Sequence, residues 1–321
     1  MSYINWGNET PEQKAARLKL EEQAIYEQAA KMRSSRTAQA PAVAGGSIAG
    51  GGSIFAEDSG LGSTVRKDLA NCASGNCSTV SGGYCNIASS SRSVVGGGCN
   101  NTSSNYFSTI SGGMCNTSSG YSSTVSGGRR NCATGGYSTV GGGYLNTGST
   151  NMATVSGGFS NTTSGNYSTV GGGRSNTASG YSSSSGGGQN NTVSGYMATV
   201  SGGFNNQATA GASTVSGGFG NTASGVRSTI GGGSSNTASG YRSIVSGGSS
   251  NTASGCWSAI VGGCNNSTNL CNCAVIAGSG ITADRNCATF VNNLSIKNIP
   301  TSSSGLPSGS VWNDGGFLKI V

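Results

Sequence analysis

The sequence predicts an all-β protein whose main part is a parallel β-solenoid of 15-residue coils. Three features recur in one register: an asparagine at every fifteenth position, a Val or Ile nine positions after it, and a glycine pair two positions further on. The fourteen asparagines are Asn71, Asn86, Asn101, Asn116, Asn131, Asn146, Asn161, Asn176, Asn191, Asn206, Asn221, Asn236, Asn251 and Asn266. The apolar series starts with Val80, Val95, Ile110, Val125 and Val140, is broken at Ser185, and is expected to run to Val275.

The residues of one unit indicate how a coil folds. Ser-Thr-Val alternates a small inward residue, an outward Thr and an apolar inward residue, which is typical of a short strand. The glycine pair supplies backbone angles that a side chain would forbid, so it is expected to turn a corner. Stacked asparagines can exchange hydrogen bonds between coils. About 15 or 16 such coils, spaced near 4.8 Å, would form a rod roughly 70 to 75 Å long.

The rest of the chain is divided by its composition. The solenoid is expected over 56–290, a helix within 1–33, a flexible linker over 34–55 and a small β cap over 291–321. The helix begins with Pro11 behind a capping box, and its apolar residues recur at every seventh position at Leu18, Ile25 and Met32. The linker is rich in Ser, Ala and Gly.

The charge distribution argues against catalysis. Between Asn71 and Gly280 there is no Asp, Glu, Lys or His, and the whole chain has no histidine. General acid–base chemistry needs a titratable group near the working pH, and a metal site needs carboxylates, imidazoles or paired thiolates. We therefore expect no catalytic residue, no metal ligand and no cofactor site, so the protein is not expected to be an enzyme.

Eleven cysteines gather towards both ends of the repeats. Counting in steps of fifteen places Cys256 and Cys271 at one position of neighbouring coils, within reach of a disulfide. The other interpretation is that the cysteines are small, reduced space-fillers. The sequence leaves both open.

Aromatic residues occupy two fixed positions of the unit. One is the fifth position after the asparagine, at Tyr106, Tyr121, Tyr181, Tyr196 and Tyr241; the other follows the glycine pair, at Tyr84, Tyr144, Phe159, Phe204 and Phe219. Such columns either stack sugar rings of a host surface or pack on one another and between chains. The six arginines of the repeats are too sparse for a nucleic-acid track. No apolar stretch of the sequence is long enough to cross a bilayer as a helix, so membrane insertion is not expected.

The typical unit, Asn-Thr-Ala-Ser-Gly-Tyr-Ser-Ser-Thr-Val-Ser-Gly-Gly, resembles the head repeats of trimeric autotransporter adhesins, and similar runs occur in fibres of bacteriophages and large viruses. The resemblance covers about 235 of the 321 residues. It implies a left-handed parallel β-roll and a homotrimer. The stretch 305–321 resembles a carboxy-terminal segment common on phage structural proteins.

These resemblances, together with an N-terminus that lacks an export signal, predict a trimeric virion fibre. Its N-terminal segment would attach to a capsid, neck or baseplate protein, and its distal tip would meet a host-surface glycan or protein. The helix has a second interpretation, packing against the foot of its own rod. The alternative functions are a purely structural decoration protein, a cell-surface adhesin and, more remotely, an ice-binding solenoid with outward threonine columns.

Overall fold

The computed structural model describes residues 55–56, 63–66, 70–293, 299–308, 310–314 and 317–320. The predicted helix with Leu18, Ile25 and Met32 lies outside these residues, as does the predicted linker over 34–55 apart from Phe55. None of the described residues forms a helix, and none therefore forms one of the length and apolar character that crossing a bilayer requires.

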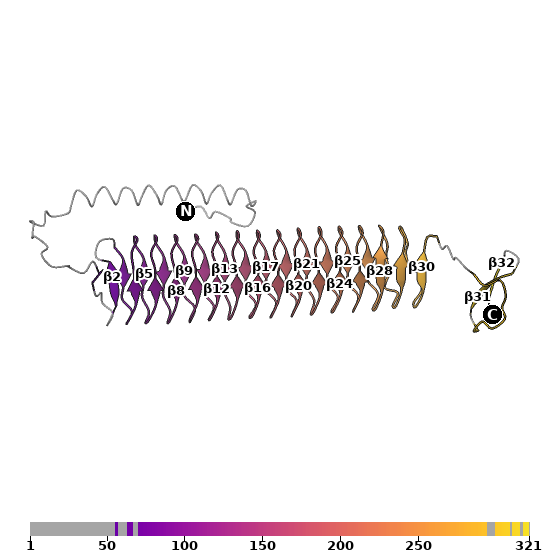
Figure 1. Cartoon of the computed structure of the whole chain (residues 1–321), viewed down its shortest axis with the longest axis horizontal. Coiled ribbons are helices and arrows are strands. Elements are labelled where there is room, and N and C mark those ends of the chain that lie inside the picture. The colour runs from indigo at the N-terminus through magenta and orange to yellow at the C-terminus, as the bar shows by residue number, and fades with distance from the viewer. Residues whose placement is uncertain are drawn as a thin grey trace, which may run out of the picture. The chain divides into compact units, whose positions relative to one another are not determined.

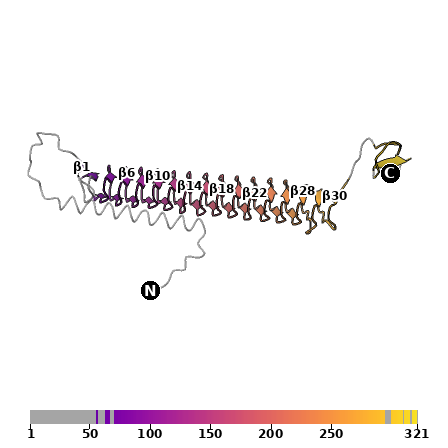
Figure 2. The same ribbon diagram turned by 90° about the horizontal axis from the view of Figure 1, so that it is seen from below.

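The predicted parallel β-solenoid is confirmed. Each coil gives one short strand to each of two sheets, and a strand pairs with its counterparts one repeat earlier and one repeat later. The strand β10 (Thr124–Val125), for example, pairs in parallel with β8 (Thr109–Ile110) and β12 (Thr139–Val140). About 15 turns follow one another along one axis (Figure 1), and the view from below shows them evenly spaced (Figure 2).

The first sheet contains the strand that the Ser-Thr-Val pattern predicts. Its parallel strands are β2 (Thr64–Arg66), β4 (Thr79–Val80), β6 (Val94–Val95), β8, β10, β12, β14 (Thr154–Val155), β16 (Thr169–Val170), β18 (Ser184–Ser185), β20 (Thr199–Val200), β22 (Thr214–Val215), β24 (Thr229–Ile230), β26 (Ile244–Val245), β28 (Ala259–Gly262), β29 (Val275–Ala277) and β30 (Thr289–Val291). Ahead of β2 lies β1 (Phe55–Ala56), which pairs with it in the antiparallel direction. The chain therefore enters the first coil through a reversed strand.

Each strand of the second sheet starts directly after a repeat asparagine, and the sequence did not predict these strands. Its members are β3 (Cys72–Ala73), β5 (Ile87–Ala88), β7 (Thr102–Ser103), β9 (Thr117–Ser118), β11 (Cys132–Ala133), β13 (Thr147–Gly148), β15 (Thr162–Thr163), β17 (Thr177–Ala178), β19 (Thr192–Val193), β21 (Gln207–Ala208), β23 (Thr222–Ala223), β25 (Thr237–Ala238) and β27 (Thr252–Ala253). Between the two sheets, the residue after each glycine pair adds a third column of single parallel bridges from Tyr84 to Cys264.

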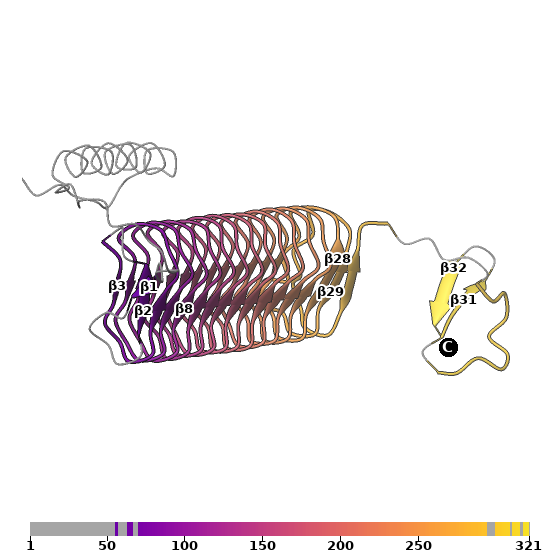
Figure 3. The same ribbon diagram turned by 60° about the vertical axis from the view of Figure 1, so that its left-hand side comes forward.

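The core is a thin stack of small side chains. The second residue of nearly every strand points inward, so the first sheet contributes a column of Val and Ile and the second sheet a column mostly of Ala. Val80, Val95, Ile110, Val125 and Val140 are fully buried. The coils lie one behind another as similar loops in the oblique view (Figure 3). Because the loop is narrow, burial of small residues replaces the large hydrophobic core of a globular domain.

The asparagines tie the coils together from inside. Asn71 is half-buried, and the thirteen from Asn86 to Asn266 are buried. Asn176 shows the scheme: its Nδ2 donates to the carbonyls of Gly172 and Gly188, each at 2.9 Å, and its Oδ1 accepts from the backbone N–H of Asn191 at 3.0 Å. Most of these bonds therefore join an amide side chain to backbone groups. Direct side-chain pairs were part of the expectation but occur at only some coils, such as Asn101 to Asn86 at 3.1 Å.

The second glycine of each pair is required by this ladder. Gly113 has a φ of +92°, and a Cβ placed on it would lie 2.1 Å from the carbonyl oxygen of Gly128 and 2.6 Å from Nδ2 of Asn116. The preceding Gly112 has no heavy atom within 4 Å of such a Cβ. The close contact between coils therefore excludes a side chain at the second glycine of this pair but not at the first.

The predicted position of Val275 in the core is wrong. β28 and β29 pair with a shifted register, so Ile260 faces Ile276, and Ile276 is the buried residue while Val275 is half-buried. The turn over 269–273 contains one extra residue, and the next repeat is one residue short, because Val275 of β29 pairs with Thr289 of β30. The extra residue also separates Cys256 from Cys271: the residue opposite Cys256 is Asn272, whose Oδ1 accepts from the Cys256 N–H at 2.8 Å.

The C-terminal stretch contains an antiparallel pair of strands. β31 (Val311–Asp314) pairs with β32 (Phe317–Ile320). The N–H of Asn313 donates to the carbonyl of Pro300 at 2.8 Å, which links the first strand to the preceding segment. The role of this hairpin as a distal cap or tip remains a prediction.

Candidate binding surface

The most distinctive surface of the solenoid is a line of large exposed side chains, mostly aromatic with two methionines, which we call the aromatic ridge. It occupies the fifth and sixth positions after the asparagine, at the turn between the two sheets. Its members are Tyr106, Phe107, Tyr121, Tyr137, Met152, Tyr167, Tyr181, Tyr196, Met197, Tyr241 and Trp257. All except the half-buried Tyr106 are exposed, Tyr196 by 57%.

Backbone geometry places the ridge. The residue at the sixth position has a positive φ, for example 57° at Tyr137 and 58° at Trp257, which is unusual for bulky side chains. Its N–H donates to the carbonyl of the fifth-position residue of the preceding coil, as Met197 does to Tyr181 at 2.9 Å. This bond between coils holds the left-handed turn and directs the side chain outward.

The rings of neighbouring coils are in contact. Tyr181 and Tyr196 stack with centroids 5.5 Å apart and planes at 13°, and Tyr121 meets Tyr137 edge to face at 5.3 Å. Such pairs contribute about 0.5–1.5 kcal/mol beyond the area they bury. The exposed parts of these rings remain accessible to an apolar partner, such as a sugar ring or a ring of another chain.

Arginines flank the ridge near both ends. Arg92 donates to the Tyr106 hydroxyl at 2.7 Å, and its guanidinium carbon lies 5.3 Å from the ring centroid of Phe107. Arg242 lies 4.3 Å from the Trp257 ring and 5.2 Å from that of Tyr241. Both clusters combine positive charge with aromatic surface, which suits an anionic or sugar-bearing ligand.

The residues after the glycine pairs form a second, flatter column. Phe204 and Phe219 stack with centroids 5.3 Å apart and planes at 6°. In the middle of the column Arg129 lies over Tyr144, and Arg174 lies over Phe159 at 5.5 Å. These arginines therefore pack against aromatic rings of their own chain.

The outward residues of both sheets are mostly threonines. They form one column on each sheet, and the first is interrupted at Val94, Ser184, Ile244, Ala259 and Val275. Cys132 replaces a threonine in the second column, and burial raises the pKa of its thiol although a hydrogen bond with Thr117 opposes the shift. Each sheet presents only one such residue per coil, because its strands are mostly two residues long. The threonine columns are therefore too narrow for a two-dimensional array of hydroxyls.

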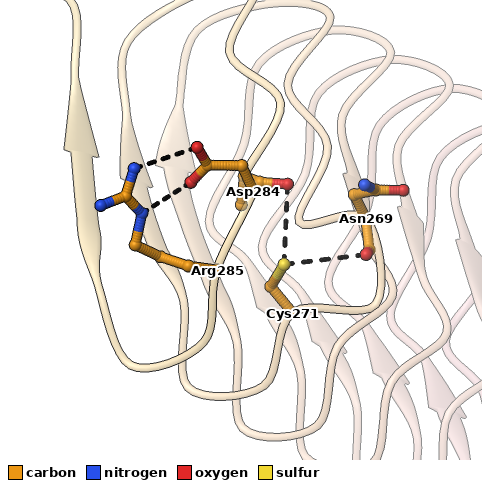
Figure 4. A network of polar contacts seen from close by, with 5 residues as sticks. Asn269, Cys271, Asp284 and Arg285 are labelled. Carbon is orange, nitrogen blue, oxygen red and sulfur yellow. Dashed lines mark hydrogen bonds and ion pairs between the residues drawn. The ribbon is translucent and has the colours of Figure 1, made fainter.

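The last coils carry the acidic side chain that the middle of the solenoid lacks. Asp284 forms two hydrogen bonds with Arg285, at 2.8 and 3.0 Å, and this contact holds the pKa of the carboxyl below its ordinary value (Figure 4). Both side chains are well exposed, so the pair contributes little stability. Among the described residues no group of three His, Cys, Asp or Glu is placed to hold a metal ion.

The predicted site residues thus divide into two groups. The asparagines and the apolar series lie inside and organise the coil, whereas the predicted tyrosine column lies outside and forms half of the aromatic ridge. Sequence reasoning missed the other half, including Phe107, Tyr137 and Trp257 at the adjacent position. The signal was present in the sequence, because bulky residues recur at that position, but only in some coils.

Comparison with known proteins agrees with the repeat. The family model described as the ubiquitous surface protein adhesin repeat matches residues 198–209. The match spans β20, the following glycine pair, Asn206 and β21, and ends before the turn that carries the ridge. No curated protein matches the chain. The solenoid is therefore built of adhesin-like repeats.

Proposed function

We propose that this chain is a non-enzymatic structural fibre of a virus particle, with an adhesin-like shaft that carries a C-terminal tip towards a host surface. The observation that carries the proposal is the uninterrupted solenoid: the 15-residue register is kept from Thr64 to Ile260. Each coil in that range is bonded to its neighbouring coils, which suits a stiff spacer.

The adhesin-like repeat and the ridge support an interaction role. The repeat match links the coil to proteins named for adhesion, and exposed aromatic surface with flanking arginines suits recognition of a surface ligand. The long stretch without titratable acids or histidines supports a role without chemistry. The proposed partners are a capsid, neck or baseplate protein at the N-terminal segment and a host glycan or protein at the tip.

The resemblance of 305–321 to phage structural proteins supports the placement on a virion. Immunogold labelling of purified particles with antibodies against the shaft tests it. Gold on particles, at a fixed distance from the capsid, is the expected result. Label confined to the surface of intact cells would instead support a cell-surface adhesin, the second candidate, which the repeat match favours equally.

The proposed fibre is a homotrimer in which the stacked tyrosines in the middle of the ridge pack against neighbouring chains, while the arginine-bearing ends of the ridge stay open to a ligand. Sedimentation equilibrium of the purified chain should give three times the mass of 31.4 kDa. Replacing Tyr181 and Tyr196 together with serine should shift that mass towards a single chain at low concentration, since both rings are exposed on the isolated chain. Replacing Ser126 and Ser156, which are exposed away from the ridge, with alanine is the matched control. A single-chain mass for the unaltered protein would overturn the trimer.

A further inference from the structure

Two turns near the end of the solenoid share one sequence and one geometry. Asn-Cys-Ala occurs at 272–274 and again at 286–288, each time directly before a strand. Because Val275 of β29 pairs with Thr289 of β30, Cys273 and Cys287 occupy the same position of adjacent coils. Both have a left-handed backbone, with φ of 55° and 52°. Their Cβ atoms therefore leave the backbone in the same direction.

Hydrogen bonds hold the two turns together. The N–H of Asn272 donates to Oδ1 of Asn286 at 2.8 Å, and the N–H of Cys287 donates to the carbonyl of Asn272 at 2.9 Å. Adjacent parallel strands lie about 4.8 Å apart. That spacing is inside the range of Cα separations that a disulfide spans, about 4.4–6.8 Å.

The two thiols also meet each other at the surface. Both cysteines are exposed, and a hydrogen bond between the thiols raises the pKa of Cys273 above its ordinary value. The sulfur atoms are thus neighbours that solvent and a small oxidant can reach. Neither forms a disulfide in the structure, and nor does any other cysteine of the described residues.

We propose that Cys273 and Cys287 are a redox site, at which an intrachain disulfide joins the last two coils when the protein meets an oxidising thiol–disulfide pool. This inference is independent of where the fibre is mounted.

The location gives the disulfide a structural purpose. The asparagine ladder ends at Asn266, whose Oδ1 accepts from the N–H of Ile281 at 3.0 Å. Ile281 occupies the next asparagine position and has no amide with which to continue the ladder. The final coil consequently has no ladder asparagine of its own and is held by backbone bonds and a few other side chains, and a covalent link there would reinforce these bonds.

The chemistry balances with oxidised glutathione as the oxidant. One thiolate of the pair attacks a glutathione sulfur, which forms a mixed disulfide and releases one glutathione thiolate. The second cysteine thiolate then attacks the protein sulfur of that mixed disulfide, forming the Cys273–Cys287 bond and expelling the second glutathione. Two electrons and the two thiol protons pass to the two glutathione molecules.

The neighbouring cysteines are placed less well for forming a disulfide. The Sγ of Cys271 is directed at the carbonyls of Ala283 and Asn269, at 3.6 and 3.8 Å, and its side chain packs against the core (Figure 4). Cys256 lies opposite Asn272, so it does not share the position of Cys273. Counting in steps of fifteen would have selected these two cysteines instead.

Trypsin offers a direct test on the full chain. Cleavage after Arg242, Arg285 and Lys297 places Cys273 in peptide 243–285 and Cys287 in peptide 286–297. After oxidation of the native chain by glutathione disulfide and alkylation of the remaining thiols, these two peptides should be joined and should separate on reduction. On a non-reducing gel the uncut chain should keep its single-chain mass, because the bond is within one chain.

Variants identify the sulfur atoms. C273S and C287S should each abolish the joined peptides, whereas C256S, C264S and C271S should retain them. Cys77 provides the matched control, because it shares the position, the exposure and the left-handed φ of 55° but faces Arg92 on the next coil. C77S should leave the joined peptides unchanged. Joined peptides in C273S, links between chains, or no joined peptides after oxidation would each overturn the proposal.

Hydrogen exchange gives an independent readout of the structural effect. The N–H of Val275 donates to the carbonyl of Ala288 at 3.0 Å, so it reports opening of the last coil. The disulfide closes the loop between Cys273 and Cys287, and this should slow exchange of the Val275 N–H by about a hundredfold in the oxidised protein. The rate in C273S should not respond to oxidation. Equal rates in the oxidised and reduced unaltered chain would contradict the structural purpose of the bond.

Discussion

The backbone N–H of Asn191 donates to Oδ1 of Asn176 at 3.0 Å, and the same bond joins successive asparagines along the solenoid. Each asparagine therefore fixes its own turn and the turn of the next coil at once. Point mutations can test this bond and the other contacts that define the coil.

Asn176→Ala should destabilise the middle of the solenoid by at least about 3 kcal/mol, because the buried N–H of Asn191 and the carbonyl of Gly172 lose their partner. Thr177→Ala, an outward change one residue away, should cost less than about 1 kcal/mol. Since repeat proteins open locally, hydrogen exchange of the Asn191 amide is the appropriate measurement. Equal exchange in the two variants would refute a structural role for the ladder.

Gly113→Ala and Gly112→Ala form a matched pair. At Gly113 the new methyl group meets the carbonyl oxygen of Gly128 and the backbone is left-handed, so we expect a loss of at least about 2 kcal/mol. At Gly112 the methyl group meets nothing within 4 Å, so the change should stay within about 1 kcal/mol. Thermal unfolding followed by circular dichroism distinguishes the two. The coil geometry described above would be contradicted by a reversed order.

Ser185→Val should stabilise the protein. Ser185 is fully buried, its Oγ has no hydrogen-bond partner, and it lies between Val170 and Val200 in the apolar column. Valine removes the unsatisfied hydroxyl and fits a position that valine occupies in both adjacent coils, so we expect a gain of about 1–2 kcal/mol. Ser184→Val on the outward side of the same strand is the control and should have a smaller effect. A lower melting temperature for Ser185→Val would show that this coil is narrower than its neighbours.

The stability of the solenoid should be nearly independent of pH between about pH 4 and 8, because linkage requires groups whose proton binding differs between folded and unfolded states. No Asp, Glu, Lys or His lies between Asn71 and Gly280. Asp284 has a lowered pKa owing to Arg285, so its contribution is present above its unfolded pKa and is lost only as the pH falls through its lower folded value. Melting temperatures across this range provide the measurement. A transition near pH 6 would contradict the expectation.

Removing Cys287 should accelerate alkylation of Cys273. The hydrogen bond with Cys287 stabilises the protonated thiol and so raises the pKa of Cys273, which lowers the fraction of reactive thiolate near pH 8. In C287S this fraction rises, and iodoacetamide should modify Cys273 faster, with the difference shrinking as the pH rises above the raised pKa. Peptide mass spectrometry of the reduced protein measures the rates, and C77S should behave like the unaltered chain. A pH-independent rate ratio would point to steric shielding instead.

The sequence was sufficient to predict the coil because the same types of residue recur at its inward positions in nearly every repeat. An asparagine, a Val or Ile and a glycine at fixed intervals specify the stacking, and the structure confirms the parallel solenoid that they predict. The second strand was harder to recognise, since in Thr-Ala or Thr-Ser only one small residue faces inward and the strand is two residues long.

The remaining misses have physical reasons. Hydrogen bonds between coils hold the left-handed turns at Phe107 and Trp257. Bulky residues such as these intrinsically prefer a negative φ, so their sequence does not predict the turn. The register shift before Val275 arises from an extra residue in the turn over 269–273, where the repeat is too degraded for the count to show it. The sixth-position half of the aromatic ridge and the Cys273–Cys287 pair follow from those two features. The 15-residue period therefore predicted the fifth-position tyrosines but not these residues.

The in-register pairing has a consequence for how such a chain changes length. A strand such as β16 pairs only with its counterparts in β14 and β18, one repeat away on either side, so duplication or loss of one whole repeat in the gene restores the same pairing at the junction. Each such event moves the two ends of the solenoid by one strand spacing, about 4.8 Å. The length of the solenoid can therefore evolve in uniform increments while the segments outside it stay unchanged.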